Sequence, residues 1–455
     1  MPTAEIRHDS ASLARFVETL STFCRSRSGA PSYIKGSSEL FVYLEKLAKR
    51  TQDYLQGFPD SPEFQTSDYE IQRQKLRSIR DGWSDIHLRL KAASDADTLH
   101  VPAALFDALR DRLHELPKYE TTEFAVFHID RVNFLHLGSD SLGKTANDIA
   151  RLVDCDPFPP TLSLIGIPYS QSDALFANCI VAHELGHFIH SAESGLNDFV
   201  KNAATAALKE AFSNEADTIK TKDSEKLTNL VELWWEELFC DLIAVRLIGP
   251  AFTHAFIEIR DLVNYIDHRG VFGKLNGTVA LDFGRTHPSH MFRIKQQGKL
   301  LEKLGWWKEI KNGKSHYITL INNAIQLDDK DFSATEFQFG KHALKAFLSI
   351  VEGLHEKVDA ALGTLSTGVD EFKLHRERVT DSLLNCSVPT TSEIDGKRHP
   401  SMVVIINAAY DVYLNSLDQL LNRIDKQKPS KIQDRVFWSR QLEAWASKAI
   451  EDLKV

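Results

Sequence analysis

The sequence of 455 residues has few cysteines, no long apolar run and no excess of positive charge, and each absence excludes a class of protein. Its five cysteines are scattered and form no CxxC pair, so neither a zinc ribbon nor a redox dithiol is encoded. No apolar run reaches the ~18–20 residues that cross a bilayer. The N-terminus, Met1–Ser10, carries charges where a signal peptide is apolar. We therefore expect a soluble, cytoplasmic protein with no transmembrane segment and with reduced, mostly buried thiols.

The overall charge is mildly acidic. The chain has 54 Lys+Arg against 63 Asp+Glu, a formal net charge of −9. This balance argues against a protein that binds nucleic acid through a basic face, so no nucleic-acid partner is expected. Apolar residues make up 43% and charged residues 26%, which is typical of globular proteins. At roughly 150 residues per domain, the length predicts two or three domains, or one enzyme core with helical additions.

Apolar periodicity predicts a mainly α, or α+β, protein in three parts. Residues 1–116 form a helical scaffold, 117–300 a core with a small sheet, and 301–455 a helical C-terminal region. Three segments of the core are rich in β-branched and aromatic residues, which favours strands. The predicted strands are Phe124–Ile129, Val132–Leu137 and Thr161–Ile167. Prolines before and after the third segment predict an edge strand.

The segment Ser172–Ser191 is predicted to be a buried helix, and it contains the pattern HELGH at 183–187. Two residues four apart on a helix are separated by about 40° around the axis and ~6 Å along it, so His183 and His187 can bind one ion. Glu184 lies beside that ion and can take a proton from water there. Polar side chains in an apolar helix are costly without a purpose. The spacing therefore predicts a catalytic zinc site.

A second helix, predicted from about Leu227 to Ile248, offers the third protein ligand that a catalytic zinc needs. Glu237 and Asp241 are four residues apart and share a face of this helix, among apolar neighbours. Glu237 can bind the metal, while Asp241 can accept the N–H of a ligand histidine and fix its orientation. Glu236 is a rival for the ligand position, although no acid follows it four residues on.

Two further side chains near the motif are assigned to other roles. Cys179 is on the same helix face as the two histidines, but eight residues, or ~12 Å along a helix, separate it from His187. All three therefore cannot bind one ion, and Cys179 is predicted to be a core residue. His190, three residues after His187, points in a different direction and is predicted to support a ligand or to lie at the surface.

An HExxH helix followed by a helix with ExxxD resembles the gluzincin class of zinc metallopeptidases. The resemblance implies a zincin-like metallopeptidase core in residues 117–300, with zinc as the cofactor. It also implies a peptide or protein substrate that lies extended along an edge strand. The roles that it implies are zinc ligands for His183, His187 and Glu237, general base for Glu184, and orientation of a ligand histidine for Asp241.

A third segment, THPSHMFRI at 286–294, resembles the THP…R(I/L) segment of the HtpX and CAAX-prenyl-protease type of gluzincin. In those enzymes a histidine and an arginine six residues later lie near the site, and His287 and Arg293 match this spacing. Either side chain can stabilise the oxyanion that forms when water attacks a peptide carbonyl. His290 competes with His287 for this position. The resemblance covers about residues 160–300, and these relatives are commonly embedded in membranes.

The predicted function is zinc-dependent hydrolysis of peptide bonds by metal-activated water, with Glu184 as general base. One alternative is a non-catalytic, zincin-like helical interaction protein with structural zinc, although structural zinc sites usually use cysteine. Another is a regulatory protease dedicated to one protein target. The helical flanks offer surface for a protein partner. The polar insertion Asn202–Thr228 is interpreted as a lid, a docking surface or a connection.

Overall fold

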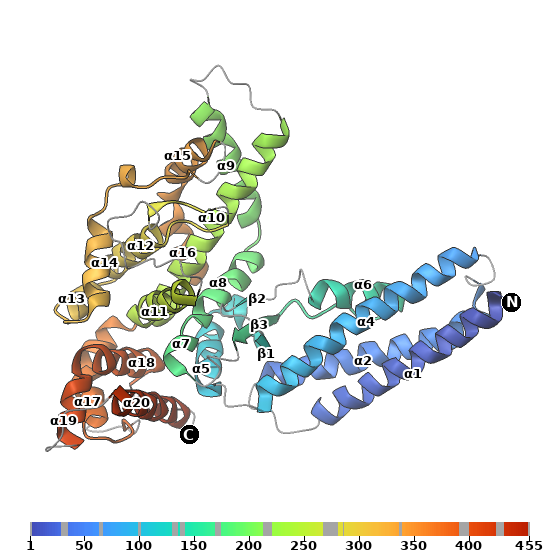
Figure 1. Ribbon diagram of the computed structural model, residues 1–455, viewed down its shortest axis with the longest axis horizontal. Coiled ribbons are helices and arrows are strands. Elements are labelled where there is room, and N and C mark those ends of the chain that lie inside the picture. Colours follow the sequence, from blue (N-terminus) through green and yellow to red (C-terminus); the bar gives the residue numbers. More distant parts are fainter. Residues whose placement is uncertain are drawn as a thin grey trace. The chain divides into compact units, whose positions relative to one another are not determined.

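The computed structural model describes residues 2–28, 35–62, 67–98, 102–129, 135–136, 142–168, 174–212, 221–266, 281–284, 286–335, 339–390, 400–424 and 432–453. It is mainly helical with one small sheet, which confirms the predicted class (Figure 1). The chain divides into two compact units, Met1–Asp173 and Ala174–Val455. Within the described ranges, no helix is both long and apolar enough to cross a membrane. All five cysteines are free, and three of them are buried.

The first unit consists of long helices and the sheet. Its elements are α1 (Pro2–Ser28), α2 (Lys35–Gly57), the 3₁₀ turns η1 (Phe58–Asp60) and η2 (Pro117–Tyr119), α4 (Tyr69–Thr98), α5 (Ala103–His114), β1 (Glu123–Ile129), β2 (Leu135–His136), α6 (Lys144–Leu152) and β3 (Leu162–Pro168). Apolar residues three and four apart, such as Leu40, Leu44 and Leu47 of α2, are buried in its core. Helices α2 and α4 both pack against β1. A Cβ on Gly36 would lie 2.1 Å from the carbonyl oxygen of Phe124, so glycine is needed where α2 meets the sheet.

The sheet has the strand order β1-β3-β2. Strand β3 pairs in parallel with β1 along its length and antiparallel with β2, where Leu135 lies opposite Gly166. The prediction that this segment is an edge strand is therefore wrong, because it is the central strand. Its prolines lie before the strand and at its last residue, Pro168, so they remove no amide from the interior of the ladder. The predicted strand Val132–Leu137 is described only at Leu135–His136.

The elements described in the second unit are all helices, and one isolated β-bridge joins Asp282 and Ser333. Its elements are α7 (Leu175–Asn178), α8 (Val181–Ala192), α9 (Leu196–Phe212), α10 (Thr221–Ile248), α11 (Pro250–Ile266), α12 (His290–Lys303), α13 (Trp306–Ile310), α14 (His316–Gln326), the 3₁₀ turn η6 (Asp329–Asp331), α15 (Gly340–Val351), α16 (Leu354–Leu362), α17 (Val369–Leu384), α18 (Met402–Asp411), the π-helix η7 (Val412–Ser416), α19 (Leu417–Ile424) and α20 (Ile432–Asp452). Helix α10 packs against α8, α9, α12 and α15, and so lies at the centre of this unit (Figure 1).

The predicted helix of residues 227–248 is confirmed, and α10 ends at Ile248 as expected. Gly249 follows with a φ of 66°, and Pro250 begins the next helix. The segment predicted as one helix over Ser172–Ser191 is instead divided into α7 and α8 by a turn. Of the predicted insertion 202–228, one end belongs to α9 and the other to α10, and residues 213–220 lie outside the described part.

The boundary between the two units falls inside the predicted core of residues 117–300. The strands belong to the first unit, because β1 packs against helices of the predicted scaffold. The HELGH helix α8 belongs to the second unit, in which α10 also packs against C-terminal helices such as α15 and α16. The predicted boundaries at residues 116 and 300 therefore do not coincide with the compact units.

Candidate metal centre

The site is formed where α8 and α10 pack against each other. At this contact, a Cβ on Gly186 would lie 2.5 Å from the Cα of Cys240. Real Cβ atoms do not approach backbone atoms so closely, so the glycine of HELGH allows the two helix backbones to come together. The histidines on either side of Gly186 are thereby brought up to the carboxylates of α10.

His183, His187 and Glu237 come together, and their candidate ligand atoms all lie within 4.8 Å of one another. Nε2 of His183 lies 3.5 Å from Oε2 of Glu237, and Nε2 of His187 lies 3.9 Å from Oε1 of Glu237. Ligand atoms ~2.0–2.2 Å from a tetrahedral zinc are about 3.3–3.6 Å apart, close to these separations. Two imidazole nitrogens and one carboxylate also form a donor set used by catalytic zinc sites. The predicted ligands therefore fit a zinc ion.

A carboxylate lies beside the other ring nitrogen of each histidine. Nδ1 of His183 lies 2.9 Å from Oδ1 of Asp241, and Nδ1 of His187 lies 2.8 Å from Oε1 of Glu236. Such contacts favour the tautomer with its proton on Nδ1, and they direct Nε2 toward the metal position. The structure places Asp241 as predicted.

The contact of Glu236 with His187 was not predicted from the sequence, in which Glu236 is a rival for the ligand position. Glu236 faces the Nδ1 of His187, whereas Glu237 faces the Nε2 of both histidines. The sequence nevertheless offers one signal for this contact, which is the number of ligand histidines. Two ligand histidines call for two acceptors, and Asp241 accounts for one of them.

Glu184 lies in the first turn of α8, beside His183, and its residue is 6% exposed. Its carboxylate is not among the grouped ligand atoms, which are those of His183, His187 and Glu237. A buried glutamate next to a ligand histidine, outside the ligand set, is available as a general base.

Arg293 is near the site, but its guanidinium is directed at carboxylates. Nε and Nη2 donate to Oδ2 and Oδ1 of Asp241, both at 2.6 Å, and Nη1 lies 3.1 Å from Oε2 of Glu237. The guanidinium also packs over the ring of Phe256, 4.7 Å from its centroid, and the side chain is 1% exposed. Arg293 therefore holds Asp241 and the candidate ligand Glu237 in place. This differs from the expected contact with a substrate oxyanion.

Of the two candidate histidines, His287 faces the cluster. Its Nε2 lies 3.4 Å from Oε1 of Glu237, and its side chain is 43% exposed. The ring of His290 instead packs against Phe256, with 6.1 Å between the ring centroids. The backbone beside His287 is held in place, because Gly284 accepts a 2.9 Å hydrogen bond from Nε1 of Trp234 on α10 and donates one to the carbonyl of His287.

Burial and charge oppose each other in this cluster. Burial lowers the pKa of His183, but Asp241 and Glu237 outweigh it and raise this pKa to about 9. Burial raises the pKa of Asp241, but Arg293 and His183 outweigh it and lower this pKa to about 2. The pKa of Glu237 is also well below its ordinary value, since Arg293 and His183 outweigh burial. A site that holds a proton on a buried imidazole so strongly has a field that favours a bound cation.

The other two residues near the motif are buried. Cys179 is fully buried, as predicted for a core residue, and burial raises the pKa of its thiol. His190 lies against the rings of Trp235 and Phe239, at centroid distances of 6.0 and 5.6 Å. Its Nδ1 lies 3.8 Å from Oε1 of Glu236. His190 therefore neighbours the residue that supports His187, consistent with a supporting role.

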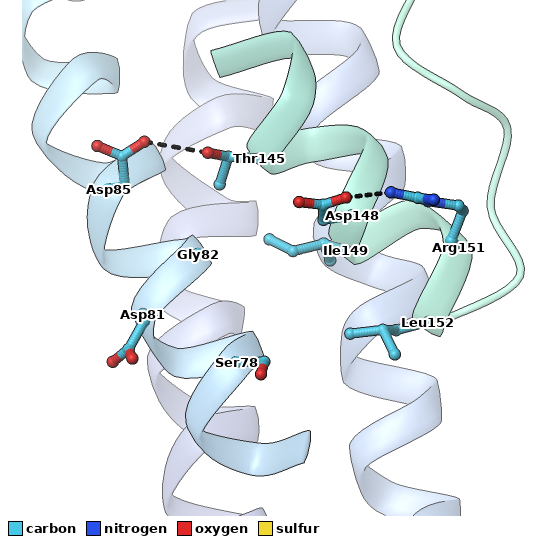
Figure 2. Close-up of a pocket in the computed structure, with 9 residues that line it drawn as sticks. All are labelled: Ser78, Asp81, Gly82, Asp85, Thr145, Asp148, Ile149, Arg151 and Leu152. Carbon is cyan, nitrogen blue, oxygen red and sulfur yellow. Dashed lines mark hydrogen bonds and ion pairs between the residues drawn. The ribbon is translucent and has the colours of Figure 1, made fainter. Parts of the chain in front are cut away.

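The first unit contains a pocket of about 660 Å³ (Figure 2). It lies between α4 and α6 and contains three aspartates. Asp85 accepts a 3.3 Å hydrogen bond from Thr145, and Asp148 is paired with Arg151. Because two of the three carboxylates already bind neighbouring side chains, the pocket does not indicate a particular ligand.

Comparisons with protein-family models, with curated proteins and with solved structures find no match to this chain. The resemblance to gluzincins therefore remains a prediction. The cluster itself indicates a function, because α8 and α10 supply a donor set that fits a metal and a buried glutamate beside it.

Proposed function

We propose that this chain is a zinc-dependent peptidase of gluzincin type, with a zincin-like core that contains α8 and α10. The observation that supports the proposal most is the paired orientation of the HELGH histidines. Their Nε2 atoms face Glu237, and their Nδ1 atoms face Asp241 and Glu236. A structural pair of histidines has no need of a carboxylate shared by both Nε2 atoms together with a further carboxylate at each Nδ1 atom.

The proposed chemistry assigns one task to each residue. Zinc held by His183, His187 and Glu237 would polarise a peptide carbonyl and make water more acidic. Glu184 accepts the proton of the attacking water and delivers it to the leaving amine. His287 lies beside Glu237 with its side chain 43% exposed, and it donates a hydrogen bond to the oxyanion as it forms.

The donor set supports catalysis over structural zinc. Structural sites are usually closed by four ligands that include cysteine, whereas this cluster has three ligands and no cysteine thiol. Cys240 is buried beside the cluster, and burial raises the pKa of its thiol well above its ordinary value, which disfavours the thiolate that a metal requires. Three ligands leave a coordination position for a substrate, which we propose to be a peptide or protein.

The test is the substitution Glu184→Gln in the full chain. This variant should keep the zinc of the wild-type protein and lose peptide-bond cleavage, because its amide cannot accept the proton. Zinc is measured by elemental analysis, and cleavage by the new protein N-termini that appear in a cell lysate. Glu193→Gln, at the other end of α8, is the matched control and should retain both properties.

Two results would contradict this proposal. Undiminished cleavage by Glu184→Gln would remove the general base. Wild-type protein that contains zinc yet yields no new N-termini would favour the structural alternative. Substitution of His183 or Glu237 by alanine should lower the zinc content, and full retention by both variants would refute the ligand assignment.

A further inference from the structure

Resting on the metal site of the proposed function, we propose that Glu236 is a positioning residue for His187 and that it sets the metal affinity of the site. Nδ1 of His187 lies 2.8 Å from Oε1 of Glu236, a hydrogen-bond distance. The contact is made to the nitrogen that does not face Glu237. Glu236 therefore acts on the metal through the orientation and basicity of His187.

The pairing follows from the way in which α8 and α10 pack. His183 pairs with Asp241, Gly186 touches Cys240, and His187 pairs with Glu236. Advancing along α8 thus means going back along α10, so the two helices are antiparallel. The histidines are ~6 Å apart along α8, and residues 236 and 241 are ~7.5 Å apart along α10, so each histidine has its own carboxylate at about its own level.

The two carboxylates differ in how firmly they are held. Asp241 is 0% exposed, and both of its oxygens accept hydrogen bonds from Arg293. The side chain of Glu236 is 31% exposed, and it lies next to two imidazoles, those of His187 and His190. Loss of Asp241 would leave the charge of Arg293 buried without its partner, whereas loss of Glu236 leaves no buried guanidinium unpaired. Glu236 can therefore be replaced with a smaller effect on the fold, which makes its effect on the metal measurable.

Supporting carboxylates of this kind typically change metal affinity by about 10–100-fold. Glu236→Gln keeps the shape and an acceptor oxygen but removes the charge, so it should weaken zinc binding moderately. Glu236→Ala removes the acceptor and should weaken zinc binding most. The expected order of affinity is wild type, then Glu236→Gln, then Glu236→Ala.

The experiment measures zinc affinity of the full chain by competition with a chelator, without any substrate. Cobalt(II) is bound in parallel, because its d–d absorption reports changes in ligand geometry. Thermal unfolding of the metal-free variants shows whether the fold is retained. Glu232→Gln, one turn earlier on α10 and outside the cluster, is the matched control and should bind zinc like the wild type.

The proposal is supported if both Glu236 variants lose affinity in the expected order, shift the cobalt spectrum and unfold like Glu232→Gln. It is overturned if Glu236→Ala binds zinc within twofold of Glu232→Gln, or if its cobalt spectrum is unchanged. The experiment measures metal binding alone. A wild-type protein that binds zinc and cleaves no peptide would therefore contradict the proposed function but not the proposal for Glu236. A wild-type protein that binds no zinc overturns both.

Discussion

The two units bury polar groups for different purposes. In the first unit, the buried hydroxyls of Ser10 and Thr51 donate to backbone carbonyls, those of Leu55 and Leu47. The second unit instead buries charges that pair between helices, as Arg293 of α12 does with Asp241 of α10.

The difference is one of cost. A hydroxyl bonded to a carbonyl is inexpensive to bury, whereas a buried ion pair carries a desolvation penalty that its attraction only partly offsets. The first unit also contains a buried carboxylate, Glu123, but its nearer partner Lys35 is 60% exposed and so remains largely hydrated, while Arg110 lies 3.6 Å away and is 16% exposed. Buried, mutually constrained charges mark places where arrangement matters more than stability, which is the pattern of a functional site. The comparison therefore favours the second unit as the place of the proposed chemistry.

The largest effect should come from Arg293→Met, which breaks the buried pair. It leaves Asp241 charged and without its guanidinium, and loss of one partner of a buried pair costs about 3–5 kcal/mol of unfolding free energy. Zinc affinity should fall as well, because the carboxylate of Glu237 loses the guanidinium that holds it in position. Denaturant unfolding and chelator competition measure the two effects. The control Arg7→Met breaks the exposed pair of the first unit, Arg7–Asp60, and should change neither quantity. Equal stability of the two variants would contradict the comparison.

A second effect should come from acidification, through His254 of α11. Burial lowers the pKa of His254 to about 4, with a partial offset from Asp411, and its ring packs near those of Tyr317 and Tyr410. In the unfolded chain its pKa is about 6.5. The unfolded state therefore takes up the proton first, and stability is lost as the pH falls from about 6.5 toward 4, by up to about 3 kcal/mol. His254→Gln does not titrate and should flatten this part of the stability profile. An unchanged slope would show that His254 is not the group responsible.

The smallest effect should come from Ser289→Ala, and it has a matched control. Ser289 caps α12 by accepting from the amide of Phe292, and Ser315 caps α14 by accepting from the amide of Ile318. Loss of either cap should cost about 1 kcal/mol of unfolding free energy. Only α12 carries Arg293, so Ser289→Ala should also weaken zinc binding, while Ser315→Ala should not. A similar zinc affinity in both variants would show that the N-terminal cap of α12 does not affect the metal site.

Much of the site could be read from local patterns. The HELGH spacing identified His183 and His187, and the four-residue step on the next helix identified Glu237 and Asp241, because residues four apart share a helix face. The helical character of both flanks also follows from short-range periodicity. The contact of Glu236 with His187 could not be read in this way, since it depends on the direction in which α8 crosses α10.

Two other features also needed the structure. The central position of β3 depends on β2, which pairs with it at two residues in the described part of the chain, so the prolines around β3 were misleading. The direction of Arg293 toward Asp241 depends on the packing of α12 against α10, which a short motif does not specify.

The amino-acid sequence by itself determined which side chains are candidates to bind a metal, because helix periodicity places His183 and His187 on one helix face, and Glu237 and Asp241 on one face of another. Only the tertiary structure decided which carboxylate meets which nitrogen, where the arginine points and which unit contains each element. Those choices depend on packing between segments about fifty residues apart, where a single close contact such as Gly186 against Cys240 sets the register of two helices.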